Sequence, residues 1–230
     1  MKDMNLDIKR YAPRAVAGLI SQAKNELQGP ADFVQSADNQ FNEVVAEVFA
    51  HYQKRLVSAN AMDFDDLLMN TNILLHQHPE ILQKYQEKFK FILVDEYQDT
   101  NHSQYLIVRA LSDRFQNICV VGDDAQSIYA FRGANINNIL NFQRDYDNVK
   151  VFRLEQNYRS TKNIVNAANA VIDKNQTKLD KVVWTANEEG EKIKVNRSHT
   201  DADEGRYVAS TIFENKMQKQ INNKDFAVLY

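Results

Sequence analysis

Residues 91–101 read Phe-Ile-Leu-Val-Asp-Glu-Tyr-Gln-Asp-Thr-Asn, and this stretch decides the fold class. Four apolar residues in a row suit a strand that is buried on both faces, as in a parallel sheet covered by helices. A second run of this kind, Ile-Cys-Val-Val at 118–121, also leads into acidic residues. The segment between them, 101–115, has a helical pattern. The sequence therefore predicts a strand, helix, strand unit whose strand ends form a ligand-binding edge.

The strand predicted at 91–94 is followed by two adjacent carboxylates, Asp95 and Glu96. At a strand end, one such carboxylate can hold Mg²⁺, and the next can polarise a water molecule for attack on a phosphate. The alternative interpretation is that the acidic pair only caps the following helix and complements its dipole. The residues alone leave both interpretations open.

The strand predicted at 118–121 leads into a turn and then an aromatic segment. Gly122 permits a sharp departure from the strand, and Gln126 could report on a phosphate. Further on, Tyr129 and Phe131 lie beside Arg132, a composition suited to stacking unpaired bases and gripping their backbone. A turn that carries two core aromatics is the alternative interpretation.

Residues 154–161 read Leu-Glu-Gln-Asn-Tyr-Arg-Ser-Thr, again at the end of a predicted strand. An arginine at this place, Arg159, can stabilise charge on a phosphoryl group in transfer. The alternative is that Arg159 only forms a surface ion pair and that Tyr158 is a packed aromatic.

The remaining pattern predicts helices at the amino-terminal end and mixed elements later. The first part contains four helices, each with one apolar face, at 13–27, 41–52, 63–74 and from 79 onward. The later part contains strands at 149–154, 193–195 and 226–230, and helices at 160–174, with Ser160 as N-cap, and at 203–220.

Composition excludes several classes of protein. The 230 residues carry 28 basic and 31 acidic side chains, a net charge of −3, and 43% hydrophobic residues, so we expect a folded globular chain. The single cysteine, Cys119, rules out an internal disulfide and favours a reducing compartment, so the expected location is cytoplasmic. No apolar run approaches the ~20 residues that span a bilayer, so no membrane partner is expected. The sequence also lacks a G-x-x-x-x-G-K-[ST] phosphate loop.

Taken together, the three segments resemble the second, third and fourth motifs of superfamily 1 DNA helicases of the UvrD/PcrA/Rep type. The matching residues are D-E-Y-Q-D-T-N, V-G-D-D-x-Q-S-I-Y-x-F-R-G-A and L-E-Q-N-Y-R-S-T, in this order. Residues 61–68 resemble the short D-F-x-D-L segment of the same family, and residues 225–230 resemble a strand before its later motifs. The resemblance covers nearly the whole chain.

At the nucleotide, the resemblance implies ATP and Mg²⁺ as cofactors. It implies that Asp95 coordinates Mg²⁺, that Glu96 activates the attacking water, and that Gln126 senses the γ-phosphate. Tyr158 is implied to stack on adenine, and Arg159 to act on the γ-phosphate as an arginine finger.

At the nucleic acid, the resemblance implies contacts with single-stranded DNA and with junctions between single-stranded and double-stranded DNA. Phe64 is implied to lie along the single strand, and Tyr129, Phe131 and Arg132 to bind it. Phe131 stands where the best-known members carry tryptophan.

The resemblance further implies an α/β fold with RecA-like parallel sheet pieces, preceded by an all-helical segment. We expect residues 1–60 to belong to a helical auxiliary subdomain, 61–150 to the first motor domain and 151–230 to the second. Since the family's phosphate loop and last motifs have no match, we expect an internal fragment of an ATP-dependent 3′-to-5′ helicase of DNA repair or replication. We also expect this fragment to be inactive alone. Two alternatives stay open: a helicase-nuclease subunit of the RecB/AddA kind, and a non-catalytic binding module with a degenerate motor fold.

Overall fold

The computed structural model describes residues 1–176, 179 and 181–230. The chain divides into two compact units. The first unit contains Met1–Arg153 and Asn175–Lys181, and the second contains Leu154–Lys174 and Val182–Tyr230.

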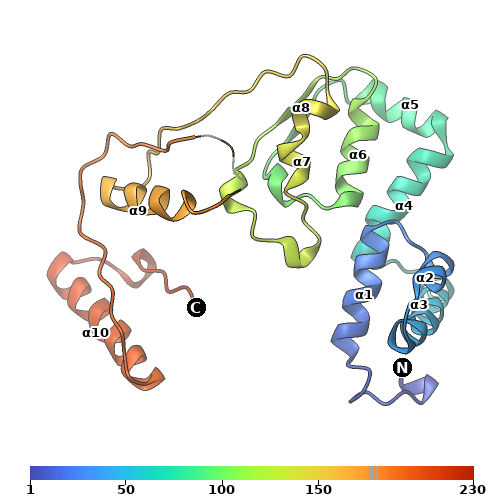
Figure 1. The fold of residues 1–230 in the computed structure, drawn as a ribbon, viewed down its shortest axis with the longest axis horizontal. Helices are drawn as coiled ribbons and strands as arrows, with labels where there is room; N and C mark the ends of the chain where they lie inside the picture. The colour runs from blue at the N-terminus through green and yellow to red at the C-terminus, as the bar shows by residue number, and fades with distance from the viewer. Residues whose placement is uncertain (177–178, 180) are drawn as a thin grey trace. The chain divides into compact units, whose positions relative to one another are not determined.

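The first unit begins with packed helices, as the sequence predicts (Figure 1). After a short turn, η1 (Lys2–Met4), these are α1 (Pro13–Asn25), α2 (Pro30–Ser36) and α3 (Gln40–Ser58). Pro13 and Pro30 each open a helix, where the missing N–H costs no hydrogen bond. Their apolar faces form one core, made of Tyr11, Val16, Ile20, Ala23, Phe33, Val45, Ala46, Val48 and Phe49.

Two further helices, α4 (Phe64–Gln77) and α5 (Pro79–Lys88), continue the helical part. Helix α4 contacts α1, α5 and α6 (His102–Ser112), so it joins the amino-terminal helices to the rest of the unit. Asp63 caps α4, because its side chain accepts a hydrogen bond from the Asp66 N–H at 2.7 Å.

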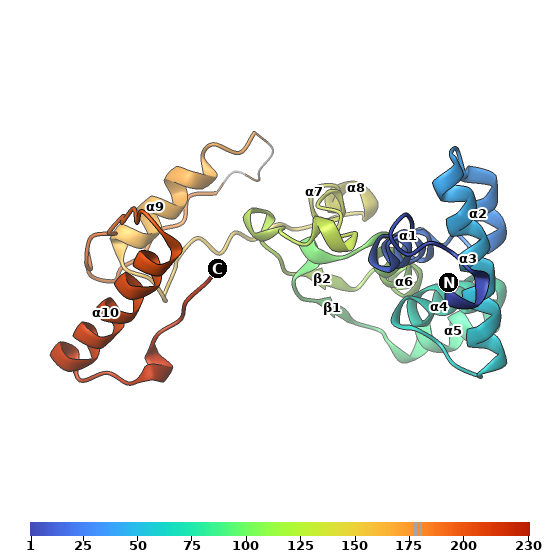
Figure 2. The same cartoon turned by 90° about the horizontal axis from the view of Figure 1, so that it is seen from below.

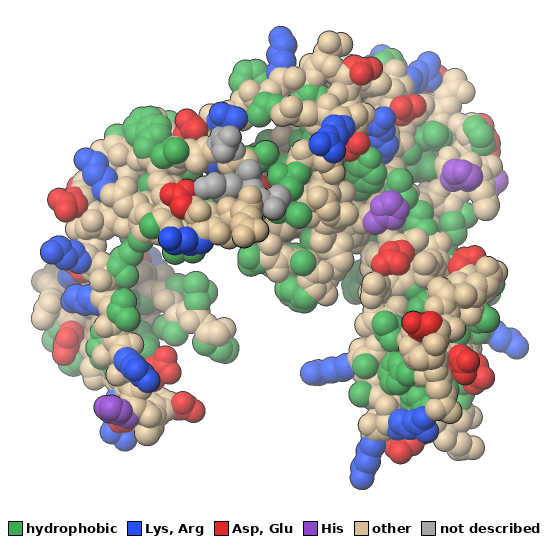
Figure 3. Space-filling model, in the orientation of Figure 1, with side chains coloured by type: hydrophobic (Ala, Val, Ile, Leu, Met, Phe, Trp, Pro, Cys, Tyr) green, Lys and Arg blue, Asp and Glu red, His purple; other side chains and the backbone are tan. Residues whose placement is uncertain are grey.

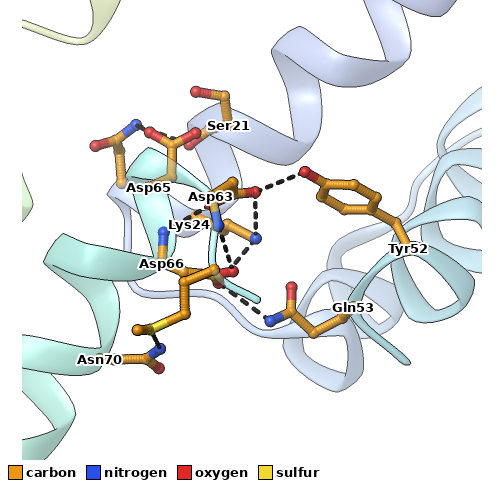
Figure 4. Close-up of polar contacts among 10 residues, drawn as sticks. Ser21, Lys24, Tyr52, Gln53, Asp63, Asp65, Asp66 and Asn70 are labelled. Carbon is orange, nitrogen blue, oxygen red and sulfur yellow. Dashed lines mark hydrogen bonds and ion pairs between the residues drawn. The ribbon is translucent and has the colours of Figure 1, made fainter. Parts of the chain in front are cut away.

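A buried ion-pair cluster ties α1 to the start of α4 (Figure 4). Lys24 Nζ lies 2.7 Å from Asp63 Oδ2 and 2.8 Å from Asp66 Oδ1, and the side chains of Lys24 and Asp66 are each only 1% exposed. From α3, Tyr52 donates to Asp63 at 3.0 Å and Gln53 donates to Asp66 at 3.1 Å. Three helices therefore meet at one charged cluster.

The cluster also sets the pKa of its more exposed carboxyl. Burial alone would raise the pKa of Asp63, but the hydrogen bonds from Lys24, Asp66 N–H and Tyr52 outweigh it and hold that pKa below its usual value. At neutral pH, Asp63 is therefore ionised, and it caps α4 as a carboxylate.

The predicted strand, helix, strand unit is confirmed. Strands β1 (Ile92–Val94) and β2 (Ile118–Val120) pair in parallel, with Ile92 opposite Ile118 and Val94 opposite Val120, and α6 connects them (Figure 2). The expected burial of both faces is wrong, since Leu93 is 79% exposed and Cys119 is exposed. Successive side chains of a strand point to opposite faces, and in these two strands only one face is partly covered.

Short helical elements follow β2 and pack near the end of β1. They are η3 (Asp124–Gln126), η4 (Ala130–Arg132), α7 (Asn137–Leu140) and α8 (Phe142–Asp145), besides η2 (Tyr97–Asp99) after β1. Tyr97 is fully buried and meets the Phe142 ring edge to face at 5.7 Å between centroids. Phe142 in turn lies 4.7 Å from the Tyr146 ring, so three aromatic rings hold this segment against η2.

The second unit contains α9 (Lys162–Ile172), α10 (Asp201–Lys219) and η5 (Asn223–Asp225). Both long helices were predicted, but Thr161 rather than Ser160 is the N-cap of α9. The backbone N–H groups of Arg159 and Ser160 both donate to Asn157 Oδ1, and this turn delays the start of the helix.

The strands predicted at 149–154, 193–195 and 226–230 are wrong for the residues that the structure describes. These segments form no ladder, and the pairing described in the second unit is an isolated bridge between Gln156 and Trp184. A strand exists only with a hydrogen-bonded partner, which a local apolar run does not provide. Leu154, Val195 and Leu229 remain largely exposed as a result.

Surface charge shows no dominant sign. On the face drawn in Figure 3, basic and acidic side chains are interspersed over both units, in keeping with a net charge of −3. Within the described part of the chain, every helix is too short or too polar to cross a bilayer.

Replacing Lys24 by methionine should destabilise the first unit strongly. The substitution keeps the length of the side chain but leaves Asp63 and Asp66 without their buried cation, and breaking such a pair costs about 3–5 kcal/mol. Urea unfolding followed by circular dichroism measures the loss. The matched control is Lys54→Met on the exposed face of α3, which should change stability by less than about 0.5 kcal/mol. Equal stability of the two variants would contradict the role of the cluster.

Candidate functional site

The site forms where the two parallel strands end at the same edge. Beyond the last ladder pair, the Val121 N–H donates to Val94 O at 2.8 Å and the Tyr97 N–H donates to Val121 O at 2.9 Å. These bonds bring the turn that carries Asp95 and Glu96 against the loop that begins at Gly122. Two of the three predicted segments therefore meet in space, as expected for carboxyl ends of parallel strands.

The acidic pair does not act as the helix cap that was one interpretation of it. Helix α6 is capped by Asn101, whose side chain accepts from the Gln104 N–H at 2.8 Å, while Gln104 Oε1 accepts from the Asn101 N–H at 3.0 Å. Asp95 and Glu96 lie upstream of this box and are exposed. Their carboxylates are therefore available for chemistry.

Glu96 has left-handed backbone geometry, with φ 50° and ψ 42°. A residue with a Cβ adopts this conformation at a cost, and such strain concentrates at functional sites. The conformation turns the chain out of β1 within one residue, and the Asp95 carboxylate accepts the Glu96 N–H at 2.9 Å within that turn.

Gln98 is a site residue that the sequence analysis missed. Its side chain is 1% exposed, its Nε2 donates to Glu96 Oε2 at 2.7 Å, and its Oε1 accepts the Asp123 N–H at 3.0 Å. The tertiary contact is the only signal, because a glutamine in a polar motif carries no sequence mark of burial.

Lys181 is a second residue that the sequence analysis missed. Its ammonium pairs with both carboxylates of the loop after β2, Asp123 and Asp124, and the distance to Asp124 is 2.6 Å. The Asp124 side chain is 1% exposed and also accepts the Leu179 N–H at 2.8 Å. Segment 175–181 therefore belongs to the first unit through these contacts.

The same contacts perturb the titration of the pair. Burial by itself would raise the pKa of Asp123, but the hydrogen bonds from Lys181, Gln126 and Ala125 N–H hold it below its usual value. Burial by itself would lower the pKa of Lys181, and its two carboxylate partners instead raise it. At neutral pH, Asp123 is therefore ionised and Lys181 is protonated, so both members of the ion pair carry their charge.

Gln126 lies in this loop, at the end of η3. Its Nε2 donates to Asp123 Oδ2 at 2.7 Å, and Asp123 Oδ1 accepts the Ala125 N–H at 3.0 Å. The structure therefore links Gln126 to Glu96 through Asp123 and Gln98.

The aromatic segment after this loop is exposed, so the interpretation as two core aromatics is wrong. Phe131 is 78% exposed and Tyr129 is 38% exposed, with ring centroids 5.9 Å apart. The Arg132 guanidinium lies 5.2 Å from the Tyr129 centroid and 5.5 Å from that of Phe131. Two π-faces and a cation form one surface, which suits bases and phosphates of a single strand.

This aromatic surface is anchored to the turn after β1. The Asn135 N–H donates to Thr100 O at 3.0 Å, and the buried Asn138 side chain donates to the same carbonyl oxygen and to Thr100 Oγ1. Asn101 also bridges Ala134. Gly133, at φ 84°, ends η4 so that the chain can turn back toward these partners.

Phe64 stands at the first position of α4 and is 90% exposed. Its position is set by the buried Lys24 cluster around Asp63 and by its neighbour Asp65, which accepts from the Asn25 amide at 3.0 Å. The side-chain oxygen of the same residue, Asn25 Oδ1, accepts from Asn101 Nδ2 at 2.6 Å. One asparagine thus connects the Phe64 turn to the capping residue of α6.

Tyr158 and Arg159 belong to the second unit, so they are described within that unit only. Tyr158 is exposed, and its hydroxyl donates to Gln156 Oε1 at 2.9 Å, so it is not a packed aromatic. Arg159 is exposed and forms no ion pair with any residue that the structure describes, which disfavours its interpretation as a surface salt bridge.

The acidic turn fits a Mg²⁺ ion that is shared with a phosphate. Asp95 and Glu96 offer exposed carboxylate oxygens, which are the donors that Mg²⁺ prefers, and this ion keeps several waters beside one or two protein ligands. In the described ranges, no three His, Cys, Asp or Glu side chains gather into a metal-binding group. The donor set therefore suits an ion that a bound nucleotide helps to hold.

Comparison with known proteins assigns the chain to a class. Residues 1–147 match the UvrD/REP helicase N-terminal domain, and residues 152–230 match the UvrD-like helicase C-terminal domain. The chain therefore belongs to the UvrD/REP helicase family.

Individual relatives are ATP-dependent DNA helicases named PcrA. The chain is 49% identical to those of Leuconostoc citreum and Bacillus subtilis strain 168 over 230 residues, and 48% identical to that of Staphylococcus aureus strain Mu50 over 233 aligned positions. Each match covers 100% of this chain and 31% of the relative, so the chain spans about a third of the length of these proteins.

The stabilisation from the Asp123 ion pair should disappear in acid. Because the pKa of Asp123 is lowered on folding, its contribution is complete above the unfolded value of about 3.9 and is lost as pH falls through the folded value. The difference in unfolding free energy between wild type and Asp123→Asn should be constant at neutral pH and shrink below about pH 4. Asp147→Asn, at an exposed carboxyl, is the control, and a pH-independent difference for Asp123→Asn would refute the assignment.

Proposed function

We propose that this chain is an internal segment of an ATP-dependent 3′-to-5′ DNA helicase, with RecA-like motor parts at 61–150 and 151–230 and a helical auxiliary part at 1–60. The observation that carries the proposal is the meeting of the acidic turn after β1 with the Gly122–Gln126 loop at one sheet edge, beside an exposed aromatic surface. Membership of the UvrD/REP family supports it.

In this proposal the first unit supplies the hydrolytic groups. Asp95 holds Mg²⁺, which neutralises charge on the phosphates of ATP when it is bound. Glu96 accepts the proton of the attacking water, and Gln126 contacts the γ-phosphate. From the second unit, Tyr158 stacks on adenine and Arg159 stabilises the charge that develops on the transferred phosphoryl group.

The DNA-binding groups of the proposal are exposed aromatic and basic side chains. Phe131 and Tyr129 stack on bases of single-stranded DNA, Arg132 contacts the backbone, and Phe64 lies along the strand from the start of α4. The substrates are single-stranded DNA and its junctions with duplex. The setting is DNA repair or replication in the cytoplasm.

The relatives favour this proposal over its alternatives. The similar proteins named above are helicases that carry the PcrA name, which gives no support to a RecB/AddA-like helicase-nuclease subunit. The helicase name of these relatives likewise gives no support to a non-catalytic module with a degenerate motor fold.

Replacing Glu96 by glutamine in the full-length helicase tests the general base. Turnover should fall about 10²–10⁴-fold, because the amide cannot accept the proton of water, while ATP affinity should be largely kept. Single-stranded-DNA-stimulated ATPase rates and nucleotide titration measure the two quantities. Glu47→Gln, on the exposed face of α3, is the matched control. Normal turnover in Glu96→Gln would show that Glu96 is not the base.

The 230-residue chain by itself should not hydrolyse ATP at a useful rate. It lacks a G-x-x-x-x-G-K-[ST] loop, and preorganised groups that hold phosphate oxygens contribute several kcal/mol to the transition state. The same ATPase assay on this polypeptide, with single-stranded DNA present, is the measurement. Robust turnover would refute the fragment interpretation.

A further inference from the structure

We propose that Gln98 is a positioning residue that couples the orientation of the Glu96 carboxylate to the loop that carries Gln126. The inference rests on the proposed function, in which Glu96 accepts a proton and Gln126 contacts phosphate. It assigns to a buried amide the link between these two groups.

The two ends of the Gln98 amide make different bonds. Nε2 donates to Glu96 Oε2 at 2.7 Å, and Oε1 accepts the Asp123 N–H at 3.0 Å. A side chain of this length that both donates and accepts is a glutamine, since a glutamate can only accept when ionised and a methionine donates nothing. Only the amide therefore serves both partners at once.

Burial makes the link costly to break. The Gln98 side chain is 1% exposed, so an amide that loses either partner cannot turn to water instead. One of its partners is charged, and hydrogen bonds with an ionised group are about twice as strong as neutral ones. The amide therefore holds one oxygen of Glu96 in place.

Gly122 makes room for this arrangement. A Cβ at position 122 would lie 2.6 Å from Gln98 Oε1 and 2.8 Å from Ile139 Cδ1, closer than real contacts allow. The Gln98 oxygen thus occupies the space that any other residue at 122 would fill. Glycine is needed here for the close approach of the amide.

The link continues from Asp123 to Gln126. The Asp123 backbone N–H donates to Gln98 Oε1 at 3.0 Å, and the Asp123 side-chain oxygen Oδ2 accepts from Gln126 Nε2 at 2.7 Å. Four residues thus form one hydrogen-bonded path from the water-activating carboxylate to the phosphate-contacting amide. A shift of the loop when Gln126 meets phosphate moves the Asp123 N–H and, through Gln98, the carboxylate of Glu96.

The first test is Gln98→Glu in the full-length helicase. Glutamate keeps the acceptor for Asp123 but replaces the donor to Glu96 by a repelling oxygen. We expect kcat of the DNA-stimulated ATPase to fall at least tenfold while the nucleotide dissociation constant changes less than threefold. Gln86→Glu is the matched control, because Gln86 also donates one amide bond, to Ala110 O at 2.8 Å, but lies away from the site on α5.

A second variant disturbs the oxygen end of the Gln98 amide. Gly122→Ala places a methyl group against Gln98 Oε1, and we expect the same selective loss of kcat. Gly18→Ala, where nothing lies within 4 Å of the added carbon, is its control. A kcat like that of wild type in either Gln98→Glu or Gly122→Ala would overturn the proposal.

A third measurement needs no catalysis. Thermal unfolding of Glu96→Gln, Gln98→Glu and the double variant tests the contact itself, because the double variant exchanges amide and carboxylate and restores the bond. We expect the double variant to recover at least half of the decrease in unfolding midpoint temperature that Gln98→Glu causes. No recovery would overturn the contact, whatever the rates.

The outcomes separate this inference from the proposed function. Normal turnover in Glu96→Gln removes the base assignment, and the thermal cycle then still decides whether Gln98 holds Glu96. An inactive Glu96→Gln with a fully active Gln98→Glu keeps the proposed function and rejects the positioning role.

Discussion

The parallel pairing of β1 with β2 is the interaction on which the site depends. Only three residue pairs form the ladder, yet the two hydrogen bonds beyond it, from Val121 to Val94 O and from Tyr97 to Val121 O, extend the pairing into the functional turns. Because parallel strands end at the same edge, the backbone pairing alone brings the acidic turn and the Gly122 loop together. Gln98 then joins them.

Buried polar groups, rather than a large apolar core, hold the site to the helices around it. The Lys24 cluster fixes the start of α4, and Asn25 connects that start to Asn101 at the cap of α6. Hydrogen bonds of this kind are directional, so they fix orientation as well as distance. Phe64 therefore stands exposed on a turn that is itself tightly held, as its proposed contact with single-stranded DNA requires.

Local pattern was a good guide to helices and a poor one to isolated strands. The helices at 13–25, 40–58 and 64–77 follow from apolar periodicity and from prolines and caps at their ends. The segments at 149–154 and 226–230 are rich in apolar residues, as β1 is, but form no ladder, because a strand depends on a partner that is distant in sequence. The exposed faces of Leu93 and Cys119 have the same cause, since burial of a strand depends on what covers it.

The sequence by itself determined the class of this protein. Its three motifs, which contain Asp95, Glu96, Gln126 and the aromatic segment, are long enough to identify a UvrD/REP helicase chain. A motif is defined by the order of residues along the chain, so it can be recognised without any tertiary contact. Only the tertiary structure decided which polar residues join these motifs. Gln98, Lys181 and Lys24 look like ordinary surface residues in the sequence. In the structure Gln98 and Lys24 are buried and Lys181 is partly buried, because segments 25 or more residues apart fold against them.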